Sequence, residues 1–193
     1  DPNEDACGVV TGSGISVAVV ADAHFGRASA EVAVDALLSA AVRSPPPADP
    51  LPWLRRQLGA IHRRVMPGSS ACALLAVVVQ GDQLSWVSIG DCRLYRLRGG
   101  VTTVLNPLEG RYLGDWGLLN LEIGEDSLQA DDRIIMASDG LPECKYGVPT
   151  ITPAQVGLIA GERPAEDAAI ALVEAALDGG GEDNIAVVLL THR

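Results

Sequence analysis

Val19-Val20-Ala21-Asp22-Ala23-His24-Phe25-Gly26 is an apolar run that ends at an aspartate and continues into a short turn containing a histidine. This pattern predicts a buried strand that carries a carboxylate to the mouth of a site. Three other segments place acids at the ends of apolar runs in the same way: Asn3-Glu4-Asp5, Ser138-Asp139-Gly140 and Asp183-Asn184. Because hard divalent cations take carboxylate oxygens as ligands, the four segments together predict a metal site.

The composition is that of a globular protein with an aliphatic core. Of the 193 residues, 48% are hydrophobic, 20% are charged and only 4% are aromatic, so Ala, Val, Leu and Ile must fill the interior. The chain carries 14 basic and 25 acidic residues and has a formal net charge of −11. Nucleic acid is therefore not expected as a partner, because phosphate binding needs clustered Lys and Arg.

Four cysteines lie far apart without a CxxC pair: Cys7, Cys72, Cys92 and Cys144. This spacing favours free thiols over a disulfide framework or a zinc cluster. The sequence has neither an apolar run long enough for a membrane span nor a signal peptide. We therefore expect a cytoplasmic monomer that does not bind membranes. We also expect a single domain over residues 1–193 that has lost an N-terminal strand.

The first two strands are predicted to form a hairpin. Residues 7–11 and 15–21 are apolar, and Gly12-Ser13-Gly14 between them is a turn sequence. A short turn joins antiparallel strands so that their outer ends meet. Glu4 and Asp22 are therefore expected to lie close together.

Two pairs of helices are predicted from apolar residues at helical spacing. In the first pair, over 28–42 and 52–66, the proline-rich segment 44–50 is interpreted as a stiff connector rather than as a ligand for a recognition domain. His62 is expected to lie among solvent-facing arginines without a specific role. The second pair covers 153–161 and 164–177, and Thr152 before Pro153 is a good N-cap.

The remaining apolar segments predict a block of strands and one final strand. We expect strands over 72–79, 83–89, 93–98, 101–105, 119–123, 132–137 and 185–190, and a loop over 106–120. Single strands do not alternate with single helices, so a Rossmann-like sheet is not expected. The order favours an α+β fold with a β-sandwich core.

The acids at the strand ends suit a particular chemistry. Glu4, Asp22, Asp139 and Asp183 would repel one another, and divalent cations would relieve the repulsion. Two cations that share one carboxylate lower the pKa of a water between them and so supply a hydroxide for in-line attack on phosphorus. His24 is placed to protonate the leaving oxygen. Each acid taken alone is an ordinary turn residue, so the hypothesis rests on all four together.

Six short segments carry a family resemblance: Asn3-Glu4-Asp5-Ala6, Ala21-Asp22-Ala23-His24-Phe25-Gly26, Gly68-Ser69-Ser70, Ile89-Gly90-Asp91-Cys92-Arg93, Ala137-Ser138-Asp139-Gly140-Leu141 and Glu182-Asp183-Asn184-Ile185. In this order they resemble the metal-dependent serine/threonine protein phosphatases of type 2C, in a compact, bacterial-like form. The resemblance spans nearly the whole chain. It implies a four-layer α/β/β/α sandwich in which two antiparallel sheets are flanked by helix pairs.

The resemblance also implies a role for each acid. Asp22 would bridge two Mn²⁺ or Mg²⁺ ions; Asp139 and Asp183 would complete the site of one ion. Glu4 and the backbone carbonyl of Ala23 would bind the other ion. The remaining implied roles are a third, weaker metal site at Asp91 and Glu143 with Asp139, orientation of waters or ligands by Asp5 and Asn184, and general acid catalysis by His24.

The sequence departs from the family in four places. Ala23 replaces a usual glycine, and Glu143 replaces a usual aspartate. The family's phosphate-binding arginine would precede Asp1, which leaves Arg27 as a candidate substitute. The flap between Arg93 and Ser138 is short, so an open site is expected.

The leading hypothesis is a Mg²⁺- or Mn²⁺-dependent phosphatase acting on phosphoserine or phosphothreonine in proteins. One alternative is a non-catalytic regulatory or sensing module that keeps the fold and binds a protein partner. A second alternative is a phosphatase for small phosphoesters. Calorimetry with Mn²⁺ discriminates the first two, because the non-catalytic module has no need to bind the ion.

Overall fold

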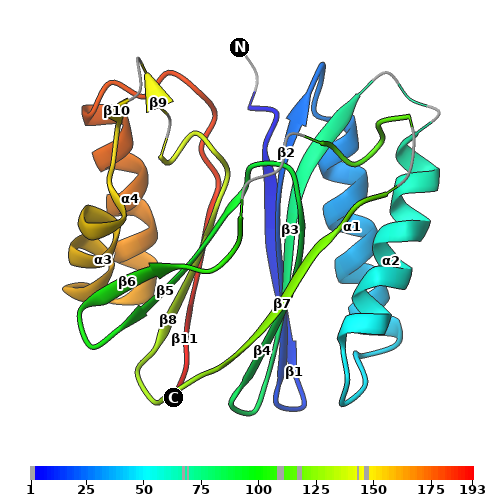
Figure 1. Cartoon of the computed structure of the whole chain (residues 1–193), viewed down its shortest axis with the longest axis horizontal. Coiled ribbons are helices and arrows are strands. Elements are labelled where there is room, and N and C mark those ends of the chain that lie inside the picture. The colour runs from blue at the N-terminus through cyan, green and yellow to red at the C-terminus, as the bar shows by residue number, and fades with distance from the viewer. Residues whose placement is uncertain are drawn as a thin grey trace.

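The chain folds into four layers, with two β-sheets face to face and a pair of helices on the outer side of each sheet (Figure 1). The computed structural model describes residues 3–66, 68, 70–107, 111–116, 119–142, 144–145 and 148–193. The predicted α+β class and the α/β/β/α layering are confirmed.

Both large sheets are antiparallel. One has the order β1 (Ala6–Gly12), β2 (Ile15–His24), β3 (Ala71–Gln80), β4 (Gln83–Ile89) and β7 (Glu122–Ser127). The other has the order β11 (Val187–Thr191), β8 (Arg133–Ala137), β5 (Arg93–Arg98) and β6 (Val101–Val104). A short hairpin of β9 (Cys144–Lys145) and β10 (Val148–Pro149), which the sequence did not predict, lies outside both sheets.

Each sheet carries one helix pair. Helices α1 (Ala28–Arg43) and α2 (Leu51–Val65) cover the five-stranded sheet, and α3 (Pro153–Gly161) and α4 (Ala165–Asp178) cover the four-stranded sheet (Figure 1). The predicted cap of α3 is confirmed, because Thr152 and Gln155 form a reciprocal capping box and Pro153 occupies the first turn. All four predicted helices are present, with ends displaced by no more than one residue.

Alternation along β2 decides which way Asp22 points. Val17, Val19 and Ala21 belong to the core beneath α1 and α2, whereas Ala18 and Val20 belong to the core between the two sheets. Because successive side chains of a strand point to opposite faces, Asp22 faces the space between the sheets. The same rule applied to β8 places Ile134 and Met136 in the core between the sheets.

The strand predicted over 119–123 is wrong in position, because β7 begins at Glu122 and ends at Ser127. Its sequence is polar because it forms the edge of the sheet, where an apolar pattern is not required. Gly124 lies under the indole of Trp86, and a Cβ at position 124 would come within 2.1 Å of Trp86 Cζ2. The pairing of β7 with β4 therefore needs glycine opposite Trp86, because a larger residue at position 124 would clash with the indole.

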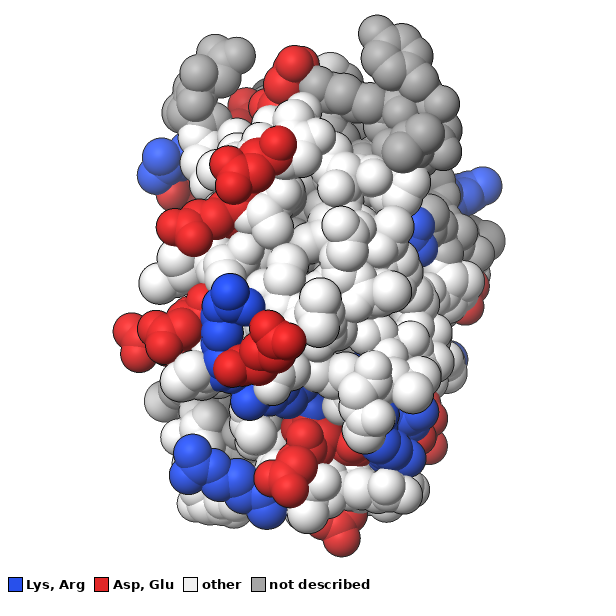
Figure 2. Space-filling model, turned by 90° about the vertical axis from the view of Figure 1, so that its left-hand side faces the viewer, with Lys and Arg blue, Asp and Glu red and all other residues white. Residues whose placement is uncertain are grey.

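Figure 2 looks onto the α3–α4 side of the molecule, where small groups of acidic and basic side chains interrupt an otherwise uncharged surface. Leu158, Ile170 and Leu177 are each more than half exposed on these two helices. Among the described residues, no helix has the length and hydropathy needed to cross a bilayer.

Candidate metal centre

Three carboxylates converge at one end of the space between the sheets. Asp22 is on β2, Asp91 follows β4, and Asp139 follows β8. Carboxylate oxygens from the three residues all lie within 4.8 Å of one another. Asp22 is the most buried of them, at 8% exposure. The two sheets thus contribute jointly to one cluster of acids.

No described lysine or arginine compensates the charge of the cluster. Burial, and then a hydrogen bond with Asp139, raises the pKa of Asp22 to about 9. Burial is also the main cause of the raised pKa values of Asp5 and Asp139. Within the described part of the chain, no lysine or arginine forms an ion pair with any of the three clustered acids. This donor set of oxygens fits a hard divalent cation such as Mg²⁺ or Mn²⁺.

The N-terminal segment is hydrogen-bonded to a segment close to the C-terminus in sequence. The backbone N–H of Glu4 donates a hydrogen bond of 2.7 Å to Asn184 Oδ1, and Glu4 Oε2 accepts one of 3.0 Å from the N–H of Gly26. These contacts place the predicted residues Glu4 and Asn184 beside the turn that follows β2. One carboxylate oxygen of Glu4 is therefore held by the backbone.

Ser138 connects Asp5 to the segment that leads into the last strand. Its buried hydroxyl donates to Asp5 Oδ2 at 2.7 Å and accepts from the N–H of Ala186 at 2.9 Å. Ser138 stands in the Ser-Asp-Gly segment, but its role was not predicted. The available signal was a small hydroxyl residue at the end of an apolar strand, next to an acid.

Asp183 lies outside the group of three clustered acids. It is exposed, and its Oδ1 accepts a hydrogen bond of 2.8 Å from the N–H of Asn184. Its charge nevertheless contributes to the raised pKa values of Asp5 and Asp139, so it lies close to the site. Glu143 falls outside the described residues.

Ala23 fits its position without strain. It lies within β2, is buried, and is paired with Cys72 of β3. The left-handed backbone conformations occur later, at Phe25 with φ 65° and at Gly26 with φ 106°. The turn therefore does not require glycine at position 23, and the carbonyl that the family uses is retained.

Tyr112 contacts two predicted site residues. Its hydroxyl donates to Asp91 Oδ2 at 3.3 Å, and its ring packs edge-on against His24 with centroids 4.3 Å apart. Burial, followed by the charge of Asp91, raises the pKa of Tyr112 to about 12, so its hydroxyl stays protonated near neutral pH. Among the described residues, neither His24 Nε2 nor Asp91 Oδ1 has a hydrogen-bond partner, although both atoms are buried.

The loop that carries Tyr112 is attached to the rest of the fold. Leu113 and Cys72 exchange backbone hydrogen bonds of 2.8 and 3.0 Å, and the N–H of Gly114 donates to His62 Nδ1 at 3.1 Å. The expectation that His62 has no specific role is wrong, because it is buried and accepts this bond. The spacing of apolar residues along α2 cannot predict this hydrogen bond, because its donor lies in a loop 52 residues later.

Arg27 is at the N-cap of α1 and is exposed. Its guanidinium pairs with Glu31 one turn later, with Nε 2.9 Å from Oε1. A role in phosphate binding would require Arg27 to exchange this surface partner, a pair of small expected strength, for the phosphate.

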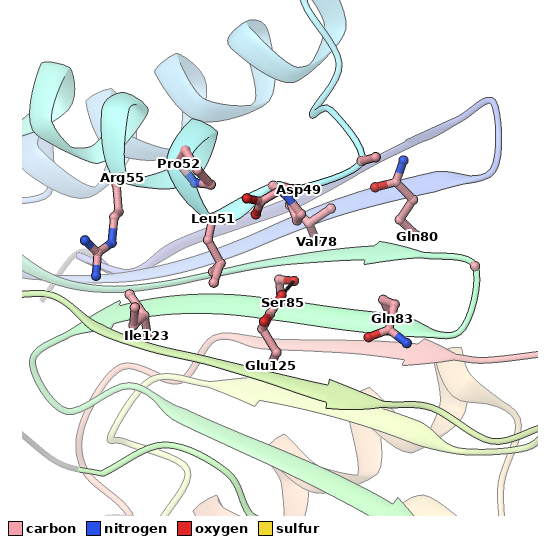
Figure 3. A pocket seen from close by; sticks show the side chains of 13 residues that line it. Asp49, Leu51, Pro52, Arg55, Val78, Gln80, Gln83, Ser85, Ile123 and Glu125 are labelled. Atoms are coloured by element: carbon pink, nitrogen blue, oxygen red, sulfur yellow. Dashed lines mark hydrogen bonds between the residues drawn. The ribbon is translucent and has the colours of Figure 1, made fainter.

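A cavity of 950 Å³ lies away from the acids, between the start of α2 and the face of β3, β4 and β7 (Figure 3). Leu51 reaches from the start of α2 toward the strands that carry Val78 and Ile123, and Arg55 and Glu125 also line the cavity. None of the clustered acids lines it. This cavity is therefore not the place where a phosphate would meet the metal centre.

The raised carboxyl pKa values predict an unusual pH dependence of stability. The pKa of Asp22 is about 9 in the folded state against an ordinary 3.8, so the metal-free fold binds protons that the unfolded chain releases. Its free energy of unfolding should therefore fall as pH rises between these two values. Thermal melts in EDTA should show a lower Tm at about pH 8 than at about pH 5, and Mn²⁺ should raise Tm mainly at the higher pH. An equal effect of Mn²⁺ at both pH values would contradict this.

Comparison with known proteins supplies an independent result. The sequence pattern of the stage II sporulation protein E (SpoIIE) family matches residues 8–193. No curated protein matches the sequence.

Several solved structures share the fold. A serine/threonine phosphatase of S. agalactiae is 17% identical, with a TM-score of 0.80 over 97% of this chain and 92% of that chain. The Mycobacterium tuberculosis serine/threonine phosphatase PstP/Ppp is 24% identical, with a TM-score of 0.76 over 97% and 91%. The Mycobacterium smegmatis PPM Ser-Thr phosphatase MsPP, in complex with cacodylate, is 25% identical, with a TM-score of 0.80 over 98% and 91%. The similarity covers all four layers.

Proposed function

Because the chain belongs to the SpoIIE family and has the fold of the type 2C serine/threonine phosphatases, we propose that it is a Mg²⁺- or Mn²⁺-dependent phosphatase that hydrolyses phosphoserine and phosphothreonine in proteins. The predicted resemblance to type 2C phosphatases is confirmed by the family match and the shared fold. The observation that carries the proposal is the convergence of Asp22, Asp91 and Asp139 within 4.8 Å, without a described lysine or arginine to neutralise them.

We assign the metal ligands as follows. Asp22 would be shared by two ions, because it is the most buried of the three clustered acids and faces the space between the sheets. Asp139 and Asp183 would complete the site of one ion, and Glu4 with the carbonyl of Ala23 that of the other. Asp91, with Asp139 and Glu143, would hold a third and weaker ion. Asp5 and Asn184 would keep these ligands in place through the hydrogen bonds of Ser138 and Glu4.

Bound divalent ions would supply an activated water and offset the charge that builds on the phosphoryl oxygens. The protein would supply orientation and a proton. His24 Nε2 is buried and makes no hydrogen bond to a described residue, so it is available to donate a proton to the serine or threonine leaving oxygen. Arg27 would bind a phosphate oxygen after releasing Glu31. Substrate proteins would enter from the exposed side of the acids, where Asp183 lies.

The non-catalytic alternative is not favoured. Keeping several acids together in a partly buried site costs free energy unless a cation binds, and a module that only docks on a partner has no use for that arrangement. The solved structures that share the fold include three serine/threonine phosphatases. A catalytic role accounts for both observations.

The test is phosphate release from a panel of phosphopeptides. Phosphoserine and phosphothreonine peptides should be hydrolysed with Mn²⁺ and not with EDTA, and a phosphotyrosine peptide of the same sequence should react at least about tenfold more slowly, because a site that orients an alkyl phosphoester misplaces a longer aryl one. Calorimetry should detect Mn²⁺ binding in the same preparation. The absence of Mn²⁺ binding would refute the proposed metal centre and support the non-catalytic module. Mn²⁺ binding without turnover of any peptide would refute phosphopeptides as the substrates.

A further inference from the structure

Tyr112 joins two parts of the candidate site that come from different elements. It makes a hydrogen bond to Asp91, which follows β4, and a ring contact with His24, the last residue of β2. We propose that Tyr112 is a positioning residue of the phosphatase site, which fixes the carboxylate of Asp91 toward the metal cluster and the imidazole of His24 toward the leaving group. The inference rests on the proposed function and assigns a task to residues 111–116 in the connection between β6 and β7.

The two oxygens of Asp91 have different environments. Oδ2 accepts the hydrogen bond from Tyr112, whereas Oδ1 is buried without a described partner. Asp91 contributes a carboxylate oxygen to the cluster with Asp22 and Asp139. A donor fixed on Oδ2 stops the carboxylate from rotating and leaves Oδ1 free for a cation, which is how groups behind a ligand increase metal affinity.

The backbone beside Asp91 is already fixed by packing. Gly90 has φ 91°, and a Cβ at this position would lie 2.5 Å from the Cβ of Ala73. The main chain therefore sits directly on β3. What remains adjustable is the side-chain rotation of Asp91, and Tyr112 is the described residue that donates to it.

His24 depends on Tyr112 in a similar way. The interplanar angle of 65° and the centroid distance of 4.3 Å describe an edge-to-face contact. The backbone of His24 is paired with Ala71, but its Nε2 makes no hydrogen bond to a described residue. The ring contact with Tyr112 is therefore a described interaction that can limit rotation of the imidazole.

Tyr112 can act in this way because it is itself well held. Its ring packs against the core between the two sheets. Its backbone N–H donates to Asp115 Oδ2 at 3.0 Å, and the next two residues are bound to Cys72 and His62. The backbone is thus held at residues 112–114, which lets Tyr112 keep its two neighbours in place.

Two substitutions separate the two contacts. Tyr112→Phe removes the hydroxyl and keeps the ring, and Tyr112→Ala removes both. Tyr95→Phe is the matched control, because it removes a hydroxyl from a tyrosine in the core beneath α3 and α4, away from the acids. The readouts are Mn²⁺ calorimetry, the imidazole proton resonances and the turnover of two substrates. The chain has three histidines, so His24→Gln assigns the His24 signal.

In Tyr112→Phe, the weakest Mn²⁺ binding event should lose about tenfold in affinity, the effect of removing a group behind a ligand, while the tighter events change less than about twofold. The His24 resonance should stay in place, because the ring is retained.

In Tyr112→Ala, the His24 resonance should move. The kcat for a phosphoserine peptide should then fall by about 10–100-fold with little change in KM, and a p-nitrophenyl phosphate control, whose leaving group needs no proton, should lose much less.

The proposal is overturned if Tyr112→Phe titrates with Mn²⁺ like the wild type and like Tyr95→Phe, or if the His24 resonance is unmoved in Tyr112→Ala. A wild-type protein that binds no Mn²⁺ would instead refute the proposed metal centre. In that case the His24 imidazole resonance in Tyr112→Ala would still test whether Tyr112 positions His24.

Discussion

Replacing Asp22 with asparagine is expected to lower Mn²⁺-dependent phosphopeptide hydrolysis by at least about 1,000-fold, equivalent to about 4 kcal/mol of lost transition-state stabilisation. Asparagine has nearly the same shape but cannot bridge two cations with a negative charge. Because Asp22 is the proposed shared ligand, the tightest Mn²⁺ binding event should also disappear from calorimetric titrations. Turnover of the phosphoserine peptide and Mn²⁺ titration of the same sample are the two measurements.

The same variant should fold at least as well as the wild type when metal is absent. Burial and the neighbouring Asp139 raise the pKa of Asp22 to about 9, so an ionised carboxylate at this position opposes folding near neutral pH. Removing the charge removes that penalty, and the Tm in EDTA at about pH 8 should rise. Loss of activity would then not be explained by unfolding.

Asp35→Asn is the matched control for Asp22→Asn. Asp35 is exposed on α1, so the identical chemical change there should leave both activity and Mn²⁺ affinity within about twofold of the wild type. If Asp22→Asn kept more than a few per cent of wild-type turnover, the assignment of Asp22 as the shared ligand would have to be abandoned.

Replacing Gly140 with alanine is the second change expected to have a large effect. A Cβ at position 140 would lie 2.0 Å from the carbonyl oxygen of Asn184, which is backbone and cannot rotate away. The segments that carry Asp139 and Asp183 would have to separate. We expect a loss of about 2–3 kcal/mol in the free energy of unfolding, as for other overpacked sites, and about a 100-fold loss of activity from ligands displaced by roughly 1 Å.

Gly12→Ala provides the comparison for Gly140→Ala. A Cβ at Gly12 meets nothing within 4 Å, so the same substitution should change stability by less than about 0.5 kcal/mol and leave turnover unchanged. Urea denaturation in EDTA measures the stability of both variants without a contribution from metal. Equal stability and equal Mn²⁺ affinity in the two variants would mean that the close approach of Gly140 to Asn184 does not hold the site together.

Local sequence patterns determined much of the fold. The apolar run along β2 predicts a buried strand, the cap at Thr152 predicts the start of α3, and four acids at the ends of apolar runs predict a shared site. These features depend on residues that are neighbours in sequence, since strand and helix periods act over a few residues. The family resemblance added the roles of the acids, and the structure brings Asp22, Asp91 and Asp139 together as an oxygen-lined cluster.

The tertiary structure alone decided the contacts that surround those acids. Tyr112 lies in a segment that the sequence marked only as a loop, yet it contacts both Asp91 and His24. Ser138 binds Asp5, which is 133 residues away, and His62 receives the N–H of Gly114, which is 52 residues away. Each partner is chosen by how sheets, helices and loops pack, and no local period carries that information. The sequence by itself therefore determined the helices, most of the strands and the acids at the strand ends, whereas packing between distant segments decided how those acids are held.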